Sequence, residues 1–319
     1  MNEIIEELQQ KLTNTGFKSS VVSVRRLPDI RRDFENLIKE GILNKDFYDE
    51  IVSRYELRWN FEPAVSSPSA ESVIITAVQQ PKVSLEFENA GKKYYAVIPP
   101  TYIHETDQEV LDVMSPFLEK HGYKACAAVL PSKLLAVRSG LAQYGRNNIT
   151  YIEDWGSYYR LRAFFSDMPC ADDKWQEPVA MELCRKCTTC IKKCPTRAIS
   201  QDRFLVNAGK CLTFFNEASY DFPEWLDPGW HNCIIGCMIC QDVCPANKDH
   251  TAWIMPGGDF SEKETSMILD GVSKDKLPAE ISEKLQKVNM LESYDLLQRN
   301  LGALIRKKQR SAGKGKKKK

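Results

Sequence analysis

Residues 184–195 read CRKCTTCIKKCP, and residues 237–245 read CMICQDVCP. The first stretch has cysteines separated by two, two and three residues and followed by proline, and the second is the same run without its first cysteine. A four-iron cubane needs a thiolate at each of four corners, and two-residue spacers let a tight loop present three sulfurs to one cluster. The fourth cysteine, three residues on, then ligates the other cluster. The two stretches therefore predict two 4Fe–4S clusters that exchange their last cysteines, as in bacterial ferredoxins.

The second stretch lacks one ligand, because Ile234 stands where its first cysteine would be. Cys211 and Cys233 are the candidates for this ligand. Cys233 lies only four residues before Cys237, an awkward arc for one cubane, whereas Cys211 belongs to a separate segment that can fold back. We therefore expect Cys211 to be the ligand. The expected first cluster takes Cys184, Cys187, Cys190 and Cys244, and the second takes Cys194, Cys211, Cys237 and Cys240.

Zinc is the alternative metal, since paired C-x2-C motifs also form tetrahedral zinc ribbons. The x3-C-P extension of both stretches is poorly explained by such sites, so iron–sulfur clusters are favoured. Cys126, Cys170 and Cys233 remain, and free cysteines are most often small buried hydrophobic residues. No histidine has a recognisable metal spacing. His231 is expected at the surface, with a hydrogen bond that tunes the second cluster as the alternative.

The composition is that of an ordinary globular protein, with 43% of the 319 residues hydrophobic and 27% charged. At roughly 150 residues per domain, about two domains are expected. No apolar stretch is long enough to span a membrane, and the charged amphipathic start does not resemble a signal peptide. We therefore expect a cytoplasmic protein whose eleven cysteines stay reduced, which favours metal ligation over disulfides.

Hydrophobic periodicity along the chain predicts an α+β fold. Helical patterns dominate residues 1–70 and recur over 107–121 and 132–139, and strand-like runs cover 72–78, 83–87, 94–98, 124–130, 149–152 and 158–165. Four regions are expected in consequence. They are an N-terminal mixed α/β domain over 1–175, a ferredoxin-like double 4Fe–4S domain over 176–260, C-terminal helices over 261–309, and a basic disordered tail over 310–319.

The positive charge of the chain is concentrated at its C-terminal end. Nine Lys or Arg and no acid lie from Arg306 to Lys319, although the net charge of the whole chain is only +1. Such a run attracts phosphate, which makes tRNA a candidate partner. No aromatic residue interleaves the lysines to stack on bases. A solvated, solubilising tail is the simpler alternative.

Beyond the cysteines, the stretch from Leu134 to Asn247 resembles epoxyqueuosine reductase, a cobalamin-dependent iron–sulfur enzyme of tRNA modification. The residues that carry the resemblance lie in the same order as in that family. LAVRSGL at 135–141 looks like its helix ending in Ala-Gly-Leu-Gly, YGRN at 144–147 like its Ile-Gly-Lys-Asn turn, GS at 156–157 like its Gly-Ser, FSDM at 165–168 like its Leu-Thr-Asp-Leu, and CLTF at 211–214 like its Cys-Ile-Ser-Tyr. The glycine motifs raise the likeness above that of a generic ferredoxin.

The resemblance implies a cobalamin-dependent reductase, on a plan that reductive dehalogenases share. It also implies that electrons pass from a reduced ferredoxin or flavodoxin-type donor through the clusters to cobalt. Glycine suits positions beside a corrin because its backbone can come close to a flat ligand, although turn formation alone also explains it. The cofactor-binding residues implied by the resemblance are Gly140, Leu141, Gly145, Arg146, Asn147, Gly156 and Ser157.

The chain departs from the family at its proton-donating Asp, which lies in a Val-Asp-Ser-Ala-Pro stretch. An ungapped alignment from Gly140 places Cys126 there, and no acid lies between Lys124 and Arg138. Cys126 is therefore the candidate catalytic residue, since a thiol with a pKa of about 8.5 can donate a proton. The family's Asp-Tyr-His segment is also missing, with Ile98-Pro-Pro-Thr-Tyr102 near its place, and Ala142 stands at the second glycine of its Gly-Leu-Gly. These departures favour a paralogue with the same electron path and another substrate. The alternatives are a corrinoid-free electron-transfer protein that serves a partner, and a nucleic-acid-binding module whose clusters are structural.

Overall fold

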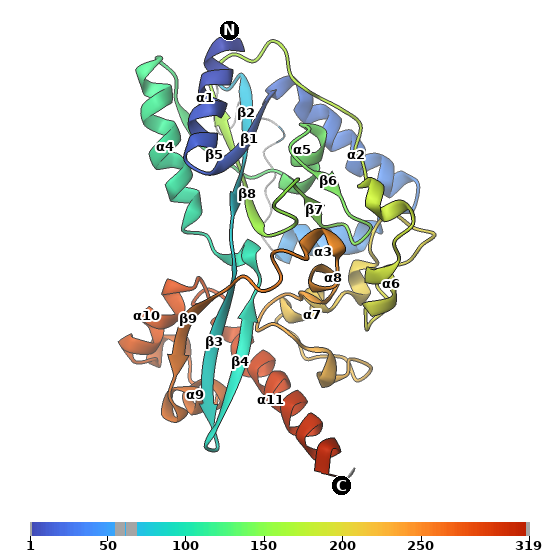
Figure 1. Ribbon diagram of the computed structural model, residues 1–319, viewed down its shortest axis with the longest axis vertical. Helices are drawn as coiled ribbons and strands as arrows, with labels where there is room; N and C mark the ends of the chain where they lie inside the picture. Colours follow the sequence, from blue (N-terminus) through green and yellow to red (C-terminus); the bar gives the residue numbers. More distant parts are fainter. Residues whose placement is uncertain (1, 55–60, 62–68, 317–319) are drawn as a thin grey trace. The chain divides into compact units, whose positions relative to one another are not determined.

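The computed structural model describes residues 2–54, 61 and 69–316 of the chain (Figure 1). The chain divides into two compact units, each made of two segments. The first unit comprises Met1–Gln79 and His104–Cys187, and the second comprises Gln80–Ile103 and Thr188–Lys319. Among the residues that the structure describes, no helix is both long enough and apolar enough to cross a membrane.

The first unit is built on a four-stranded antiparallel sheet in the order β1-β2-β8-β5. A separate pair, β6 and β7, forms a small two-stranded sheet. The strands of the first unit are β1 (Phe17–Ser23), β2 (Ser72–Gln79), β5 (Ala125–Ala128), β6 (Gln143–Tyr144), β7 (Thr150–Tyr151) and β8 (Tyr159–Ser166). Its α-helices are α1 (Asn2–Asn14), α2 (Leu27–Lys39), α3 (Lys45–Arg54), α4 (Thr106–Lys120) and α5 (Ser132–Arg138).

Helices cover both faces of this sheet (Figure 1). Successive side chains of a strand point to opposite faces, so Val73 and Ile75 of β2 pack with α2 and α5, while Ile74 packs with α1 and α4. Burial on both faces explains why β2 reads as the nearly continuous apolar run SVIITAV. The N-terminal mixed α/β region expected from the sequence is thus confirmed.

The second unit contains a three-stranded sheet in the order β4-β3-β9. Strands β3 (Lys82–Asn89) and β4 (Lys92–Ile98) form a hairpin, and β9 (Ile254–Phe260) lies parallel to β3. The two hairpin residues, Ala90 and Gly91, both have positive φ, as a type I′ turn requires. Helices α9 (Glu262–Leu269), α10 (Ala279–Lys287) and α11 (Tyr294–Lys316) supply apolar residues that bury one face of this sheet.

The structure differs from the sequence-based expectation at three places. Strands β1 and β9 had not been expected, because FKSSVVS and IMPGGDF lack a regular apolar alternation. Strands β3 and β4 fall in the second unit, although their residues were expected in the first domain. Helix α11 continues to Lys316 through a tail expected to be disordered, since its Lys, Arg, Gln and Ala residues are good helix formers. The last three residues lie outside the described part.

Candidate iron–sulfur and cofactor site

The two cysteine motifs form short helical turns that leave their thiols half-buried. In the first motif Cys184 lies in a 3-10 turn (Glu182–Arg185), and α6 (Thr189–Lys193) ends just before Cys194. In the second motif α8 (Ile239–Asp242) carries Cys240, and a 3-10 turn (Pro245–Asn247) begins directly after Cys244. Within the second unit, α6 packs against α8. The repeated motif therefore brings two matching cysteine-bearing turns side by side.

The prolines after the last cysteines begin only short turns. Pro245 opens a 3-10 turn, whereas Pro195 is followed by a turn that ends at Arg197, with φ of 55°. A residue in this left-handed region does not continue a right-handed helix. The backbone N–H of Ala198 then donates to the Sγ of Cys194 at 3.3 Å. No helix therefore follows Cys194 directly, and the turn instead directs a backbone donor at its sulfur.

Three of the four cysteines expected at the second cluster influence one another electrostatically. Burial, with smaller contributions from the nearby Cys211 and Cys194, raises the pKa of Cys237 to about 11. Burial also raises the pKa of Cys211, with a contribution from Cys194. Several thiolates this close together would be costly to bury unless positive charge neutralised them. An iron–sulfur cluster, which binds thiolates, fits this set of donors.

Hydrogen-bond donors point at these same sulfurs. The side-chain amide of Asn232 donates to Cys237 at 3.2 Å, and the backbone N–H groups of Thr213 and Phe214 lower the pKa of Cys211. Donors of this kind favour the thiolate, which is the form that ligates iron. No three His, Cys, Asp or Glu side chains among the described residues are gathered closely enough to hold a single metal ion. A four-iron cluster is larger than one ion and needs its thiolates further apart.

Cys233, the other candidate for the missing ligand, lies in a different environment. Its side chain is fully buried, and its thiol donates to the Oδ1 of Asn232 at 3.1 Å. Burial raises its pKa well above the usual value. Its neighbours Ile234 and Ile235 belong to the apolar core of the second unit. Cys170 is also buried, in the core of the first unit. Both match the expectation that unused cysteines are small buried hydrophobic residues.

The turn at Gly145–Asn147 contacts the first cysteine of the first motif. The backbone N–H of Arg146 donates to the Sγ of Cys184 at 3.4 Å, and its guanidinium donates to the Cys184 carbonyl at 2.6 Å. The Nε of Arg146 is buried and has no partner. A cofactor-side residue predicted from the resemblance is therefore in direct contact with a predicted cluster ligand. Its buried Nε remains as a donor for a bound group.

The predicted glycines have identifiable backbone roles. Gly140, with φ of 75°, ends α5 in a Schellman motif, in which the N–H of Leu141 donates to the Ala136 carbonyl at 2.9 Å. At Gly145 an added Cβ would lie 2.5 Å from a ring carbon of Tyr151. Gly156 has φ of 57°. Backbone conformation therefore accounts for Gly140 and Gly156, and close packing against Tyr151 accounts for Gly145, so the approach of the three glycines to a corrin stays a prediction.

Cys126, the candidate catalytic residue, lies in β5 at the edge of the four-stranded sheet, opposite Phe165 of β8. Its side chain is exposed, which differs from the buried strand expected over 124–130. An edge strand of only four residues covers little of its own side chains, so burial by the sheet is incomplete. Exposure leaves the thiol accessible to a substrate or to solvent.

His231 was expected at the surface and is instead fully buried. Its ring centroid lies 4.5 Å from that of Phe222, and neither ring nitrogen has a hydrogen-bond partner. Lys307 of α11 donates to its backbone carbonyl at 2.6 Å. The helix and the aromatic residues that bury it are distant in sequence, so local composition did not reveal the burial. The alternative role is not supported, because neither ring nitrogen donates a hydrogen bond to a cysteine among the residues that the structure describes.

Burial lowers the pKa of His231 to about 4, assisted by Arg299, Lys307 and Arg306. Unfolded histidine has a pKa of about 6.5, so the unfolded chain takes up the proton first as the pH falls. The stability contributed by neutral His231 is therefore present above about pH 6.5 and is lost toward pH 4. We expect urea unfolding to give a free energy up to about 2 kcal/mol lower at pH 5 than at pH 7. In His231→Phe this part of the pH dependence should disappear; an unchanged pH profile would contradict the assignment.

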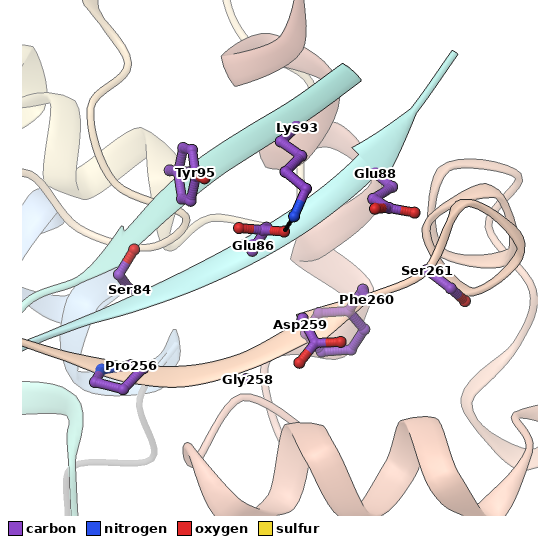
Figure 2. A pocket seen from close by; sticks show the side chains of 10 residues that line it. All are labelled: Ser84, Glu86, Glu88, Lys93, Tyr95, Pro256, Gly258, Asp259, Phe260 and Ser261. Atoms are coloured by element: carbon purple, nitrogen blue, oxygen red, sulfur yellow. Dashed lines mark ion pairs between the residues drawn. The ribbon is translucent and has the colours of Figure 1, made fainter. Parts of the chain in front are cut away.

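A surface pocket of about 550 Å³ lies on the outer face of the three-stranded sheet. Figure 2 shows its charged side chains around the ion pair of Glu86 and Lys93, with Tyr95 and Asp259 nearby. None of the predicted cluster or cofactor residues lines it. The pocket is therefore separate from the candidate site.

Comparison with known proteins bears out the double-cluster domain that the cysteine spacing predicted. Residues 183–247 match the family model of a 4Fe-4S double cluster binding domain. The epoxyqueuosine reductase of Cyclobacterium marinum is 35% identical over 114 residues, which cover 35% of this chain and 36% of the relative. That of Atelocyanobacterium thalassa is 25% identical over 264 residues, covering 78% and 81%. The matches to the first two curated relatives span only about a third to a half of their length.

Solved structures are similar over nearly the whole chain. The epoxyqueuosine reductase from Streptococcus thermophilus has a TM-score of 0.66 at 21% identity and covers 96% of this chain and 81% of its own. An epoxyqueuosine reductase with an epoxyqueuosine-modified tRNA-Tyr stem loop has a TM-score of 0.65 at 22% identity, covering 96% and 82%. The resemblance seen in the sequence is thus confirmed, and so are the double-cluster domain and the fold class.

Proposed function

We propose that this chain is a divergent relative of the epoxyqueuosine reductases, an oxidoreductase that passes electrons through two 4Fe–4S clusters to a cobalamin-type cofactor. A corrinoid supplies an electron-rich cobalt centre for a reductive reaction, while the protein binds and orients it. The proposed ligands are Cys184, Cys187, Cys190 and Cys244 for the first cluster and Cys194, Cys211, Cys237 and Cys240 for the second.

The contact between Arg146 and Cys184 supports this proposal most strongly. Arg146 lies in the turn that resembles the corrin-side turn of the reductases, and it donates to both the sulfur and the carbonyl of Cys184. Electron transfer requires the donor and acceptor groups to lie close together. A turn that contacts a cluster ligand and also carries an unpartnered buried Nε is suited to that purpose.

The environments of Cys211 and Cys233 support Cys211 as the fourth ligand of the second cluster. The nearby Cys194 raises the pKa of Cys211, and the Cys211 sulfur accepts hydrogen bonds from the backbone N–H groups of Thr213 and Phe214. Cys233 is held in the interior and donates its own proton to Asn232. A thiol that serves as a donor is protonated, whereas an iron ligand must be a thiolate. The same comparison assigns Cys233 a packing role.

Gly140, Leu141, Gly145, Arg146, Asn147, Gly156 and Ser157 are proposed to form the corrin side of the first unit. Asn147 is already held in place, because its side-chain amide donates to the hydroxyl of Tyr151 at 2.9 Å. Cys126 is proposed as the proton donor, since its thiol is exposed and the ungapped alignment from Gly140 puts it at the position of the family's acid. A thiol in place of a carboxyl group favours a substrate other than epoxyqueuosine in tRNA. Reduction of epoxyqueuosine in tRNA by the protein reconstituted with clusters and cobalamin would contradict the proposal of a different substrate.

Electron delivery to a bound corrinoid tests the function. The reconstituted protein, loaded with cobalamin under anaerobic conditions, is mixed with a chemically reduced flavodoxin, and the corrinoid absorbance is followed. We expect reduction in the wild type and in Cys233→Ser, and a rate at least about tenfold lower in Cys211→Ser, which lacks a ligand of the second cluster. Equal rates in all three proteins would show that electrons do not pass through the second cluster.

A corrinoid-free electron carrier is the second candidate function. The observation in its favour is that the predicted glycines are explained by backbone geometry without any ligand. Such a carrier would be reduced by the flavodoxin but would retain no cobalamin. tRNA stays a proposed partner in either case, because a related reductase has been solved with a tRNA stem loop. Binding through the basic tail would weaken with added salt. Both roles are consistent with the cytoplasmic location expected from the sequence.

A further inference from the structure

The loop from His231 to Met238 is organised around the side chain of Asn232. Its Nδ2 donates to the carbonyl of Trp230 and to the Sγ of Cys237, each at 3.2 Å. Its Oδ1 accepts from the backbone N–H of Met238 at 2.8 Å and from the thiol of Cys233 at 3.1 Å. All the hydrogen-bonding groups of this amide are therefore directed at the loop that carries the first cysteine of the second motif.

The partners fix which end of the amide faces the sulfur. The backbone N–H of Met238 can only donate, so the group beside it must be the amide oxygen. The carbonyl of Trp230 can only accept, so the group beside it must be the amide nitrogen. Rotating the amide by half a turn would leave both bonds unmade. The group facing Cys237 is thus an N–H donor.

The surroundings of the loop hold this contact in place. Ile234 and Ile235 are buried in the core of the second unit. The Gly236 carbonyl accepts from the buried side-chain amide of Asn216 at 2.8 Å. Gly236 itself has φ of 65°. A hydrogen bond in such a partly buried, fixed setting is stronger than one exposed to water.

A donor of this kind acts differently on the two oxidation states of a cluster. The reduced cluster carries one more negative charge, so an N–H group beside its thiolate stabilises the reduced state more than the oxidised state. Hydrogen bonds to the sulfurs are among the factors that set cluster potentials. Backbone donors, such as Arg146 beside Cys184 and Ala198 beside Cys194, can be removed only by proline, which also constrains the backbone. Asn232 supplies a side-chain donor that can.

We propose that Asn232 is a positioning residue whose side-chain N–H donates to the Cys237 sulfur and raises the reduction potential of the second cluster. The proposal rests on the cluster assignment made above. It names a role for a residue that lies outside both cysteine motifs. The removal of this one N–H should make the second cluster harder to reduce without removing its iron.

The test is a potentiometric titration of the reconstituted full chain followed by electron paramagnetic resonance at pH 8. Asn232→Asp keeps the oxygen that accepts from Met238 but replaces the N–H donor with a carboxylate. Asn232→Ala removes both. We expect the midpoint potential of one cluster to fall by ~59 mV in both variants. At a fixed potential this lowers the ratio of reduced to oxidised cluster about tenfold for a one-electron couple. The other midpoint should not move.

Cys233→Ala is the matched control, because it removes a neighbouring hydrogen bond to the same amide without touching the donor to Cys237. Its midpoints should equal those of the wild type. Full iron content with unchanged midpoints in both Asn232 variants would overturn the role of Asn232 and leave the cluster assignment intact. A midpoint shift in Cys233→Ala equal to that in the Asn232 variants would also overturn the role of Asn232, because the effect would then come from the loop as a whole. A wild type that takes up no second cluster would overturn both proposals.

Discussion

Replacement of Cys211 by serine is expected to remove about half of the roughly eight irons that two 4Fe–4S clusters supply. Cys211 would be the fourth ligand of the second cluster, and a cubane that loses a thiolate is readily lost. The measurement is the iron content per chain after anaerobic reconstitution and desalting. The absorbance of the remaining cluster should fall in proportion. This is the largest change in composition that one substitution in this chain should produce.

Cys233→Ser is the control for this result. Cys233 also lies near Cys237, and it was the competing candidate from spacing. Because its thiol is buried and donates to Asn232, its replacement should leave the iron content near that of the wild type. The reverse pattern, with iron lost from Cys233→Ser and kept in Cys211→Ser, would show that the second ligand set is wrong.

Replacement of Arg138 by methionine is expected to lower the free energy of unfolding by about 3 kcal/mol, since it removes a buried guanidinium and leaves the partly buried Asp33 carboxylate without its cation. The guanidinium is 7% exposed and makes two hydrogen bonds to the Asp33 carboxylate, at 2.6 and 2.9 Å. It also donates to Glu177 at 3.0 Å and lies over the ring of Trp175. Arg138 is the last residue of α5, so its loss should also loosen the turn at Gly140.

Equilibrium urea unfolding of wild type and variant measures this effect. Arg32→Ala is the control, because Arg32 pairs with Asp29 in α2 but is 63% exposed. An exposed pair contributes at most about 1 kcal/mol. A loss for Arg138→Met no larger than that for Arg32→Ala would mean that the buried ion pair does not stabilise the first unit.

The cysteine spacing predicted the double-cluster domain because ligand geometry is encoded locally. The strand SVIITAV and the helix over 107–121 were predictable for a similar reason, since their apolar patterns reflect the faces that they bury. The strand FKSSVVS was not, because its place in the sheet depends on pairing with β2, roughly fifty to sixty residues away along the chain. The local sequence pattern therefore predicted a segment's structure where ligand spacing or a buried face is encoded within that segment.

Two features of the candidate site had no local signal. The burial of His231 depends on packing by Phe222 and on α11, whose residues follow much later. The role of Asn232 depends on a loop that closes on itself and brings an ordinary asparagine against Cys237. The turn at Gly145–Asn147 was found only through a resemblance, and its contact with Cys184 required the fold.

Anaerobic reconstitution with iron, sulfide and cobalamin, followed by desalting and an ultraviolet–visible spectrum, tests the central claim most directly. We expect about eight irons per chain and corrinoid bands that stay with the protein above the iron–sulfur absorbance. Retention of both would establish an iron–sulfur protein that holds a corrinoid and would turn attention to its substrate. About eight irons with no retained corrinoid would contradict the proposed reductase and leave an electron carrier whose partner protein has to be found.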